Sequence, residues 1–476
     1  MNFLRSRPQY LLFAGVLAVY FAFLTCTYYW DGVLFSLNIE SVHQGRIPFS
    51  ALFHPNHLFY NSFGYAVYSA ASVLWSGIRA ITVLQIGNTI LSACSGYVLF
   101  LIARRITASK ATGLFGWLLF AAGATWWKFS TDADTYIVAV FLLLLSALFF
   151  LEGRIWPAAM CHTAAMLFHE LAVFSYIPVL ATLLLNRAQP LPKRVATCLA
   201  YCATTGAIVA GTYIYCYLLL TNTPNSTGFI SWITGYAQDT NFTRSVSDIV
   251  SHYLTSYVKL FAGGKVSLIL QFFGVAEALA FVACLALLIW GVRLLKQTGS
   301  TSASKIDRKA MTFLWAWFFG YALFLAAFDP GSAFHKLFVW PVMVLLIGIY
   351  VRNHARAATL FAGALAAWNF GAFIFPHSHD SADPVLVFAE KVNRELPKNA
   401  TVYYAALDPD DWYLEYFAPG RQWKRLADDD DLTGGCFETT ALSRFTDGSL
   451  RINPKMKWDL VNSAHNIRLE CLQKTP

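Results

Sequence analysis

The sequence contains few charged residues. Asp, Glu, Lys and Arg make up 13% of its 476 residues, about half of the share found in a typical soluble domain. Hydrophobic residues make up 57%, and the mean hydropathy is +0.49. This composition excludes a disordered protein, a coiled coil and a small disulfide scaffold, and it predicts a polytopic membrane protein. The aromatic share of 16% fits lipid-facing helices with aromatic belts at both membrane interfaces.

Motifs of several enzyme and transporter classes are missing. The sequence has no P-loop, no Gly-x-Gly-x-x-Gly after a strand, no Gly-x-Ser-x-Gly and no Cys-x-x-Cys. No internal repeat is visible, which argues against transporters built from paired halves. The net charge of +8 does not indicate nucleic-acid binding, because the basic residues fall in short loops rather than in a basic stripe. We therefore expect no nucleic-acid partner.

Apolar runs close to the length of a transmembrane helix recur along the chain. The first is not a cleavable signal, because no small-residue cleavage site follows it. The stretch from His57 to Trp75 is less apolar, and its bulky Phe59, Phe63 and Val67 recur at helical spacing, which predicts an interfacial amphipathic helix. The predicted spans are roughly 9–29, 81–102, 111–127, 136–151, 155–168, 171–186, 195–220, 268–292, 311–328, 337–351 and 356–375.

The distribution of charge predicts the topology. With 57–75 at the interface and the N-terminus in the cytoplasm, most loop Lys and Arg residues fall on the inner side. Eleven spans then leave the C-terminus outside the inner (plasma) membrane. The inner loops contain only the acids Glu152 and Asp307, whereas outer acids often lie close to a span end, where a charge is costly and usually functional. Any chemistry is therefore expected to face outward.

The composition changes after Phe375 to that of a soluble domain. Asp383-Pro384 predicts the start of a helix that continues to about Leu396. A second helix is expected over 410–417, and strands over 401–407 and 467–472. The predicted fold is an all-α polytopic membrane domain (1–375, with outer loops 30–80 and 221–267) followed by a small extracytoplasmic α/β domain (376–476). Cys436 and Cys471 lie in that exported domain, where we expect them to pair.

Asp31 is the candidate catalytic residue. It follows Tyr29-Trp30 directly after the first span and precedes Gly32. A carboxylate held at the membrane surface can act as a general base. The alternative is a simple stop signal flanked by an aromatic belt, although Lys and Arg rather than Asp dominate topology.

Two further motifs are candidates for substrate or metal binding. The acid-x-acid pair Asp132 and Asp134 suits a divalent cation, Mg or Mn, that bridges phosphate oxygens, but it could equally cap the following helix. His54 and His57, separated by Pro55-Asn56, could bind a metal, donate hydrogen bonds to substrate or phosphate, or cap a helix. A third metal ligand at a fixed spacing is absent from this segment.

Two polar interruptions of apolar sequence complete the candidate substrate-binding residues. His169-Glu170 separates two short apolar runs, and such a pair is costly at membrane depth unless it lines a polar cavity. A buried structural pair is the alternative. His335-Lys336 ends a polar outer turn that begins at Asp329. Lys336 there can pair with a lipid phosphate or simply extend its ammonium to the interface.

Taken together, these motifs resemble the GT-C superfamily of membrane glycosyltransferases. The resemblance rests on Asp31 after the first span, the interfacial helix entered through 54–58, the acids Asp132 and Asp134, and the exported C-terminal domain. The chain looks most similar to the protein O-mannosyltransferase-like and aminoarabinose transferase-like branch. It departs from that branch at Gly32, where a second acid is common, and at Lys336, where Arg is common.

The resemblance implies an outward-facing enzyme that uses a polyprenyl-phosphate-linked sugar and inverts its anomeric carbon. Asp31 would take the proton of an acceptor hydroxyl, carried by a glycan, a lipid or a protein. Lys336, or a cation at Asp132 and Asp134, would stabilise the leaving phosphate. A non-enzymatic transporter or flippase of lipid-linked sugars is the alternative, although it would need charged residues along a path to the cytoplasm. An O-antigen polymerase or ligase should carry several Arg in a large outer loop, and 221–267 has one.

Overall fold

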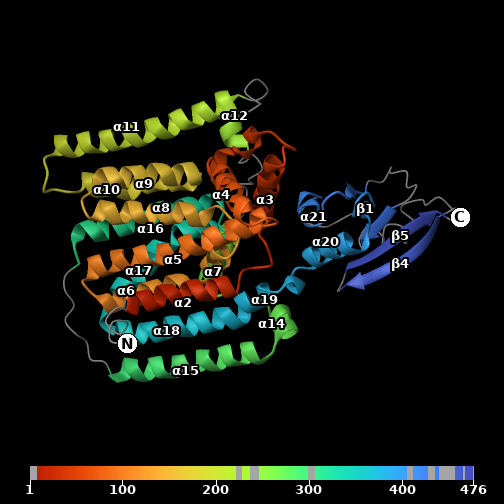
Figure 1. Ribbon diagram of the computed structural model, residues 1–476. Helices are drawn as coiled ribbons and strands as arrows, with labels where there is room; N and C mark the ends of the chain where they lie inside the picture. Colours follow the sequence, from red (N-terminus) through yellow and green to blue (C-terminus); the bar gives the residue numbers. More distant parts are fainter. Residues whose placement is uncertain are drawn as a thin grey trace. The chain divides into compact units, whose positions relative to one another are not determined.

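The computed structural model describes residues 8–220, 228–235, 246–297, 306–404, 411–426, 435–438, 456–464 and 467–474. The chain divides into two compact units. The first comprises Met1–Leu24 and Asn38–Pro376, and the second comprises Thr25–Leu37 and His377–Pro476. Figure 1 shows that the first unit is built from helices and that the β-sheet lies in the second.

The first unit is a bundle whose long helices run side by side (Figure 1). Its α-helices are α2 (Pro8–Ala22), α4 (Tyr60–Leu74), α5 (Ala80–Thr107), α6 (Lys110–Ala122), α7 (Ala124–Ser130), α8 (Tyr136–Leu151), α9 (Ile155–Phe168), α10 (Tyr176–Leu184), α11 (Leu191–Tyr215), α12 (Phe229–Thr234), α13 (Val246–Phe261), α14 (Val266–Phe272), α15 (Val275–Gln297), α16 (Arg308–Phe328), α17 (Trp340–Tyr350) and α18 (Ala355–Asn369). Short turns of other helix types include η2 (Pro55–His57), η3 (Glu170–Ser175), η6 (His335–Phe338) and the π-helix η8 (Phe370–Ile374). Helix α3 (Trp30–His43) begins in the second unit and ends in the first.

The expected helical membrane fold is confirmed. Every predicted span contains a helix, and among the described residues five helices are long and apolar enough to cross a membrane. The remaining apolar helices are shorter, so the number of eleven spans stays a prediction. The five long helices cover Ala80–Thr107, Leu191–Leu218, Val275–Lys296, Arg308–Phe328 and Arg352–His377.

The predicted span 111–127 is divided by a break at Gly123. Helix α6 ends at Ala122, and α7 begins at Ala124. A Cβ atom on Gly123 would lie 2.6 Å from the Trp340 indole, whose Nε1 donates a hydrogen bond to the Phe120 carbonyl. The glycine therefore lets the backbone turn against a tryptophan from a distant helix, and the turn gives α7 its own direction.

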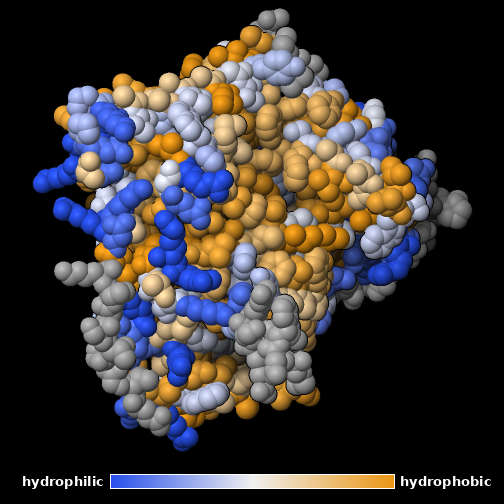
Figure 2. Space-filling view, turned by 60° about the vertical axis from the view of Figure 1, so that its left-hand side comes forward, coloured by the Kyte–Doolittle hydropathy of each residue, from blue (hydrophilic) through white to orange (hydrophobic). Residues whose placement is uncertain are grey.

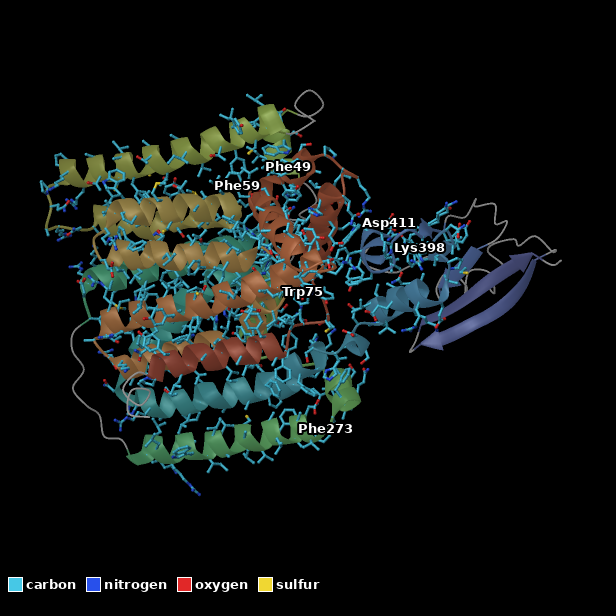
Figure 3. All side chains as sticks on the ribbon, in the orientation of Figure 1. Phe49, Phe59, Trp75, Phe273, Lys398 and Asp411 are labelled. Atoms are coloured by element: carbon cyan, nitrogen blue, oxygen red, sulfur yellow. The ribbon has the colours of Figure 1, made fainter. Side chains whose placement is uncertain are left out.

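Helix α4 corresponds to the predicted interfacial segment. It buries Tyr60, Asn61 and Tyr68 but exposes Phe63 and Val67, so its apolar side faces outward from the protein. Figure 1 shows α4 running across the direction of the long helices at one end of the bundle. An exposed apolar face on a transverse helix is typical of a helix that lies in the membrane interface. Exposed aromatic rings lie at the same end (Figure 3): Phe49, Trp75 and Phe273.

Arginine side chains cap helix ends at the opposite end of the bundle. Arg105 donates two hydrogen bonds to the carbonyl of Leu151, the last residue of α8. Arg194 donates to the carbonyl of Leu184, the last residue of α10. Cations at C-terminal carbonyls complement the helix dipole. Figure 2 shows hydrophilic side chains gathered over this end, with hydrophobic surface beside them.

The second unit contains a mixed five-stranded sheet in the order β2-β1-β3-β5-β4. Strand β1 pairs in parallel with β2 and β3, and β5 pairs antiparallel with β3 and β4. The two C-terminal strands form an antiparallel pair across a short connection. The strands are β1 (Thr401–Tyr404), β2 (Gln422–Arg425), β3 (Gly435–Glu438), β4 (Met456–Ala464) and β5 (Ile467–Lys474).

Helices α20 (Pro384–Glu395) and α21 (Asp411–Phe417) accompany this sheet. Asp383 caps α20 as predicted, because its carboxylate accepts hydrogen bonds from the backbone N–H groups of Val385 and Leu386. Cys436 is disulfide-bonded, and the strand register places Cys471 opposite it, in agreement with the predicted pair. The end of the predicted strand 401–407 lies outside the described residues. The buried core contains Phe388, Ala389, Val392, Val402, Tyr404, Leu414 and Ala418.

Candidate functional site

The turn that carries Asp132 and Asp134 is fixed by polar side chains of α5. Asn88 donates hydrogen bonds from its Nδ2 to the backbone carbonyls of both residues, at 2.8 and 2.7 Å. Gln85 donates to the carbonyl of Thr131 at 2.8 Å. Gln85 and Asn88 are three residues apart and therefore lie on one helix face. This face holds the acidic turn at the end of α7.

The two carboxylates of this turn already accept hydrogen bonds. Asp132 is fully buried; its Oδ2 accepts from the Lys128 ammonium, and its Oδ1 accepts from the N–H of Ala133. Oδ1 of Asp134 accepts from the N–H and hydroxyl of Thr135. No group of three metal-binding side chains occurs among the described residues. This donor set does not fit a divalent cation as it stands, because Lys128 already supplies the positive charge, so we derive no reaction step through a metal.

A basic cavity of about 300 Å³ adjoins this turn. Three lysines from different segments line it: Lys128 of α7, Lys259 of α13 and Lys265 just before α14. Lys259 and Lys265 are exposed, and Thr125 donates a hydrogen bond to the Lys259 carbonyl, which joins α13 to α7. The rest of the cavity wall is mostly apolar, so these lysines are its source of positive charge, which suits an anion with several oxygens such as a phosphate. The other lining residues include Phe129, Gly263, Gly264, Ala333, Phe334 and Phe373.

His54 and His57 stack on each other around the turn η2. Their ring centroids are 4.7 Å apart, with an interplanar angle of 16°. Stacked rings do not direct their nitrogens at one point, so this pair alone does not form a metal site. His54 is exposed and His57 is buried, and burial lowers the pKa of His57 well below its ordinary value. His57 is therefore neutral and can exchange hydrogen bonds without carrying charge.

His169 has a defined tautomer. Its Nδ1 accepts a hydrogen bond from the N–H of Leu171 at 3.2 Å, so the proton of the neutral ring is on Nε2. Burial, with a smaller contribution from His335, lowers the pKa of His169 to about 3. The Nε2–H is thus a neutral donor. Glu170 is the first residue of η3 and is half-buried.

Tyr136 joins two of the predicted segments. Its ring lies 4.9 Å from His169 and 6.1 Å from His335, measured between centroids. Nδ1 of His335 lies 3.2 Å from a carboxylate oxygen of Asp329. The structure therefore brings His169 and His335 together around one aromatic ring, although the sequence separates them by more than 160 positions.

Lys336 is enclosed rather than exposed. Its side chain has no exposed surface, and its ammonium donates hydrogen bonds to the carbonyls of Pro330 and Ser332 at 2.9 and 3.0 Å. The ammonium also lies 4.9 Å from the Tyr253 ring centroid and 5.4 Å from that of Tyr257. Through these contacts Lys336 connects the turn that contains Pro330 and Ser332 with α13.

Asp31 belongs to the second unit, in the first turn of α3. Its side chain is half-buried, and burial raises the pKa of the carboxyl group to about 6. A carboxylate with a pKa near the working pH combines a high deprotonated fraction with useful basicity. This electrostatic property suits the general base that the sequence predicts.

No protein-family model and no curated protein matches the sequence. Solved structures do match. ArnT from Cupriavidus metallidurans bound to undecaprenyl phosphate superimposes with a TM-score of 0.60 and 11% sequence identity, over 97% of each chain. The chain has the ArnT fold. The apo state of ArnT matches with a TM-score of 0.59 and 12% identity, over 98% of each chain.

ArnT is an aminoarabinose transferase and a GT-C glycosyltransferase, so the predicted resemblance to that superfamily is confirmed as a resemblance of fold. Together with the five long apolar helices among the described residues, this fold supports an integral membrane protein. Within it the structure identifies residues that sequence reasoning missed. Gln85 and Asn88 were visible as two polar residues three positions apart in an apolar run. Lys259 and Lys265 were not singled out, because the sequence does not show that they line the same cavity as Lys128.

Proposed function

We propose that this chain is a membrane glycosyltransferase that takes a sugar from a polyprenyl-phosphate donor. The observation that carries the proposal is the cavity lined by Lys128, Lys259 and Lys265. Its chemistry suits a phosphate, and ArnT, whose fold the chain shares, has been crystallised with undecaprenyl phosphate. The proposed donor phosphate therefore binds among these lysines.

In the proposed reaction Asp31 removes the proton of an acceptor hydroxyl. The hydroxyl oxygen forms a bond to the anomeric carbon from the side opposite the lipid phosphate, which inverts that carbon. The bond between the anomeric carbon and the phosphate oxygen breaks, and its electron pair leaves with polyprenyl phosphate. The lysines stabilise the charge that develops on this leaving group. Asp132 supports the reaction indirectly by orienting the Lys128 ammonium.

We propose that transfer takes place on the extracytoplasmic side. The support is the set of arginines and lysines at the opposite end of the bundle, since cytoplasmic loops are enriched in basic residues. The N-terminus is then cytoplasmic and the C-terminal domain extracytoplasmic. The acceptor is a hydroxyl of a glycan, a lipid or a protein.

The experiment that tests the proposal is sugar transfer from a polyprenyl-phosphate donor by the purified full-length protein in detergent. The Asp31→Asn variant keeps the shape of the side chain but removes the proton acceptor. General-base catalysis contributes about 10²–10⁴-fold, so transfer should fall by that factor while donor binding is retained. Wild-type transfer by Asp31→Asn would defeat the mechanism. Movement of the lipid-linked sugar across vesicles without any transfer would instead support the flippase.

A further inference from the structure

The segment that leads to Asp31 is fastened to the C-terminal domain. Cys26 donates a backbone hydrogen bond to the His377 carbonyl at 2.8 Å, and its thiol donates to the Ser378 carbonyl at 3.3 Å. The Thr25 hydroxyl donates to the same His377 carbonyl at 3.4 Å. All of these residues belong to the second compact unit. The segment just before Asp31 therefore contacts a segment that lies about 350 positions later in the sequence.

An aromatic contact extends this attachment. The Tyr28 ring stacks on Phe417 of α21, with centroids 5.5 Å apart and an interplanar angle of 24°. Tyr28 precedes Asp31 by three residues, and regular helix begins only at Trp30. The residues between the end of α2 and the start of α3 do not form a regular helix. Their position therefore depends on contacts such as this stack.

Phe417 is itself held by the domain. It packs against the hydrophobic core of the second unit and lies 5.1 Å from the Tyr413 ring centroid. The Tyr413 hydroxyl donates a hydrogen bond at 2.9 Å to Asp383, the residue that caps α20. The Phe417 ring is therefore held by the packed core of the domain. It gives the segment between α2 and α3 a fixed surface to stack on.

We propose that Tyr28 and Phe417 are positioning residues that hold Asp31 in place for proton abstraction. The C-terminal domain then acts on catalysis through the position of Asp31, beyond any role in binding the acceptor. This inference rests on the proposed function, because it takes Asp31 to be the base. Positioning of a reacting group is worth large factors in rate, and misplacement by about 1 Å costs about 10²-fold.

The test measures transfer kinetics of full-length protein variants. Tyr28→Ala removes the stacked ring from the loop and leaves the core of the domain intact. We expect kcat to fall about 10- to 100-fold while the KM for the polyprenyl-phosphate donor stays unchanged. Tyr28→Phe keeps the ring and should retain wild-type kcat. Trp412→Ala, which removes another half-buried ring of α21, is the matched control and should leave kcat unchanged.

A double-mutant cycle separates positioning from general damage to the domain. If Tyr28 and Phe417 act through their contact, Tyr28→Ala combined with Phe417→Ala should lower kcat no further than the more damaging single change. Additive losses, or wild-type kcat in Tyr28→Ala, would overturn the inference. The Asp31→Asn variant keeps the two proposals apart. If Asp31→Asn transfers sugar normally, Asp31 is not the base and the proposed mechanism fails, whereas a loss confined to Asp31→Asn defeats only the positioning role. If the wild type transfers no sugar, the proposed function itself fails.

Discussion

The Lys128 ammonium donates a hydrogen bond to the Asp132 carboxylate four residues later, in a setting almost closed to solvent. The Asp132 side chain is fully buried and the Lys128 side chain is 13% exposed. Lys128 thereby lies between a buried carboxylate and the basic cavity. This relationship gives the acidic turn a role that needs no metal ion: it sets the position of a cation.

The first prediction concerns chelation. Because Lys128 already neutralises Asp132, incubation with EDTA should leave sugar transfer unchanged. Lys128→Met should instead lower the melting temperature, since breaking a buried ion pair by removing one partner costs about 3–5 kcal/mol. Adding Asp132→Asn to Lys128→Met removes the stranded charge and should restore part of that loss. Inactivation by EDTA that Mg or Mn reverses would show that transfer requires a divalent cation and would contradict a metal-free acidic turn.

The second prediction concerns the two exposed lysines of the cavity. Lys259→Ala and Lys265→Ala should each raise the KM for the donor about tenfold, because a hydrogen bond to a charged group is worth about 1.5–3 kcal/mol. The effect should shrink as salt screens the remaining charges. Lys398→Ala changes an exposed lysine of the other unit and is the matched control (Figure 3). An unchanged donor KM in both cavity variants would contradict the phosphate site.

The third prediction concerns pH. Burial raises the pKa of Asp31 to about 6, so the carboxylate gains a proton as the pH falls through that value. Because only the deprotonated form accepts a proton, kcat/KM, which reports ionisations of the free enzyme, should be level above pH 7 and should fall to about one-tenth at pH 5. In Asp31→Asn the residual rate should not follow this curve. A wild-type profile that is flat between pH 5 and 7 would exclude this ionisation.

Local pattern was sufficient to predict much of the fold. The apolar runs predicted the helices of the bundle, and the bulky residues of 57–75 predicted α4. The N-cap at Asp383 was equally visible, because a cap depends only on neighbouring residues. The short strands β2 and β3 were not predicted. Each has four residues, too few to show an alternating pattern.

The candidate site was harder to predict because its parts meet through long-range contacts. The break at Gly123 depends on Trp340, more than 200 positions away. Lys336 looked available to a lipid phosphate because its neighbours in sequence are polar. The rings that cover it, Tyr253 and Tyr257, come from α13, about 80 positions earlier. The roles of the individual residues remain predictions that the variants test.

The enclosure of Lys336 leads to the last prediction, which separates it from the lysines of the cavity. Lys336→Met removes two hydrogen bonds to buried carbonyls. The Pro330 carbonyl still accepts a hydrogen bond from the Ser256 hydroxyl, whereas the Ser332 carbonyl loses its Lys336 donor, which costs about 1–3 kcal/mol. The melting temperature should fall, while the donor KM of the folded protein should stay at the wild-type value. A raised KM with an unchanged melting temperature would show instead that Lys336 contacts the lipid phosphate.

The pH dependence of this stability difference has a definite sign. Burial, partly offset by Asp329, lowers the pKa of Lys336 to about 8, whereas an unfolded lysine keeps its proton to about pH 10.5. Between these values the unfolded chain binds more protons, so the stability of the wild type rises with pH. The contribution of Lys336 to the free energy of unfolding is therefore at its maximum above about pH 10.5. This contribution falls with the pH and is lost as the pH drops through about 8. The difference in melting temperature between wild type and Lys336→Met should therefore be larger at pH 9.5 than at pH 7. A difference that is smaller at pH 9.5 would contradict the buried ammonium.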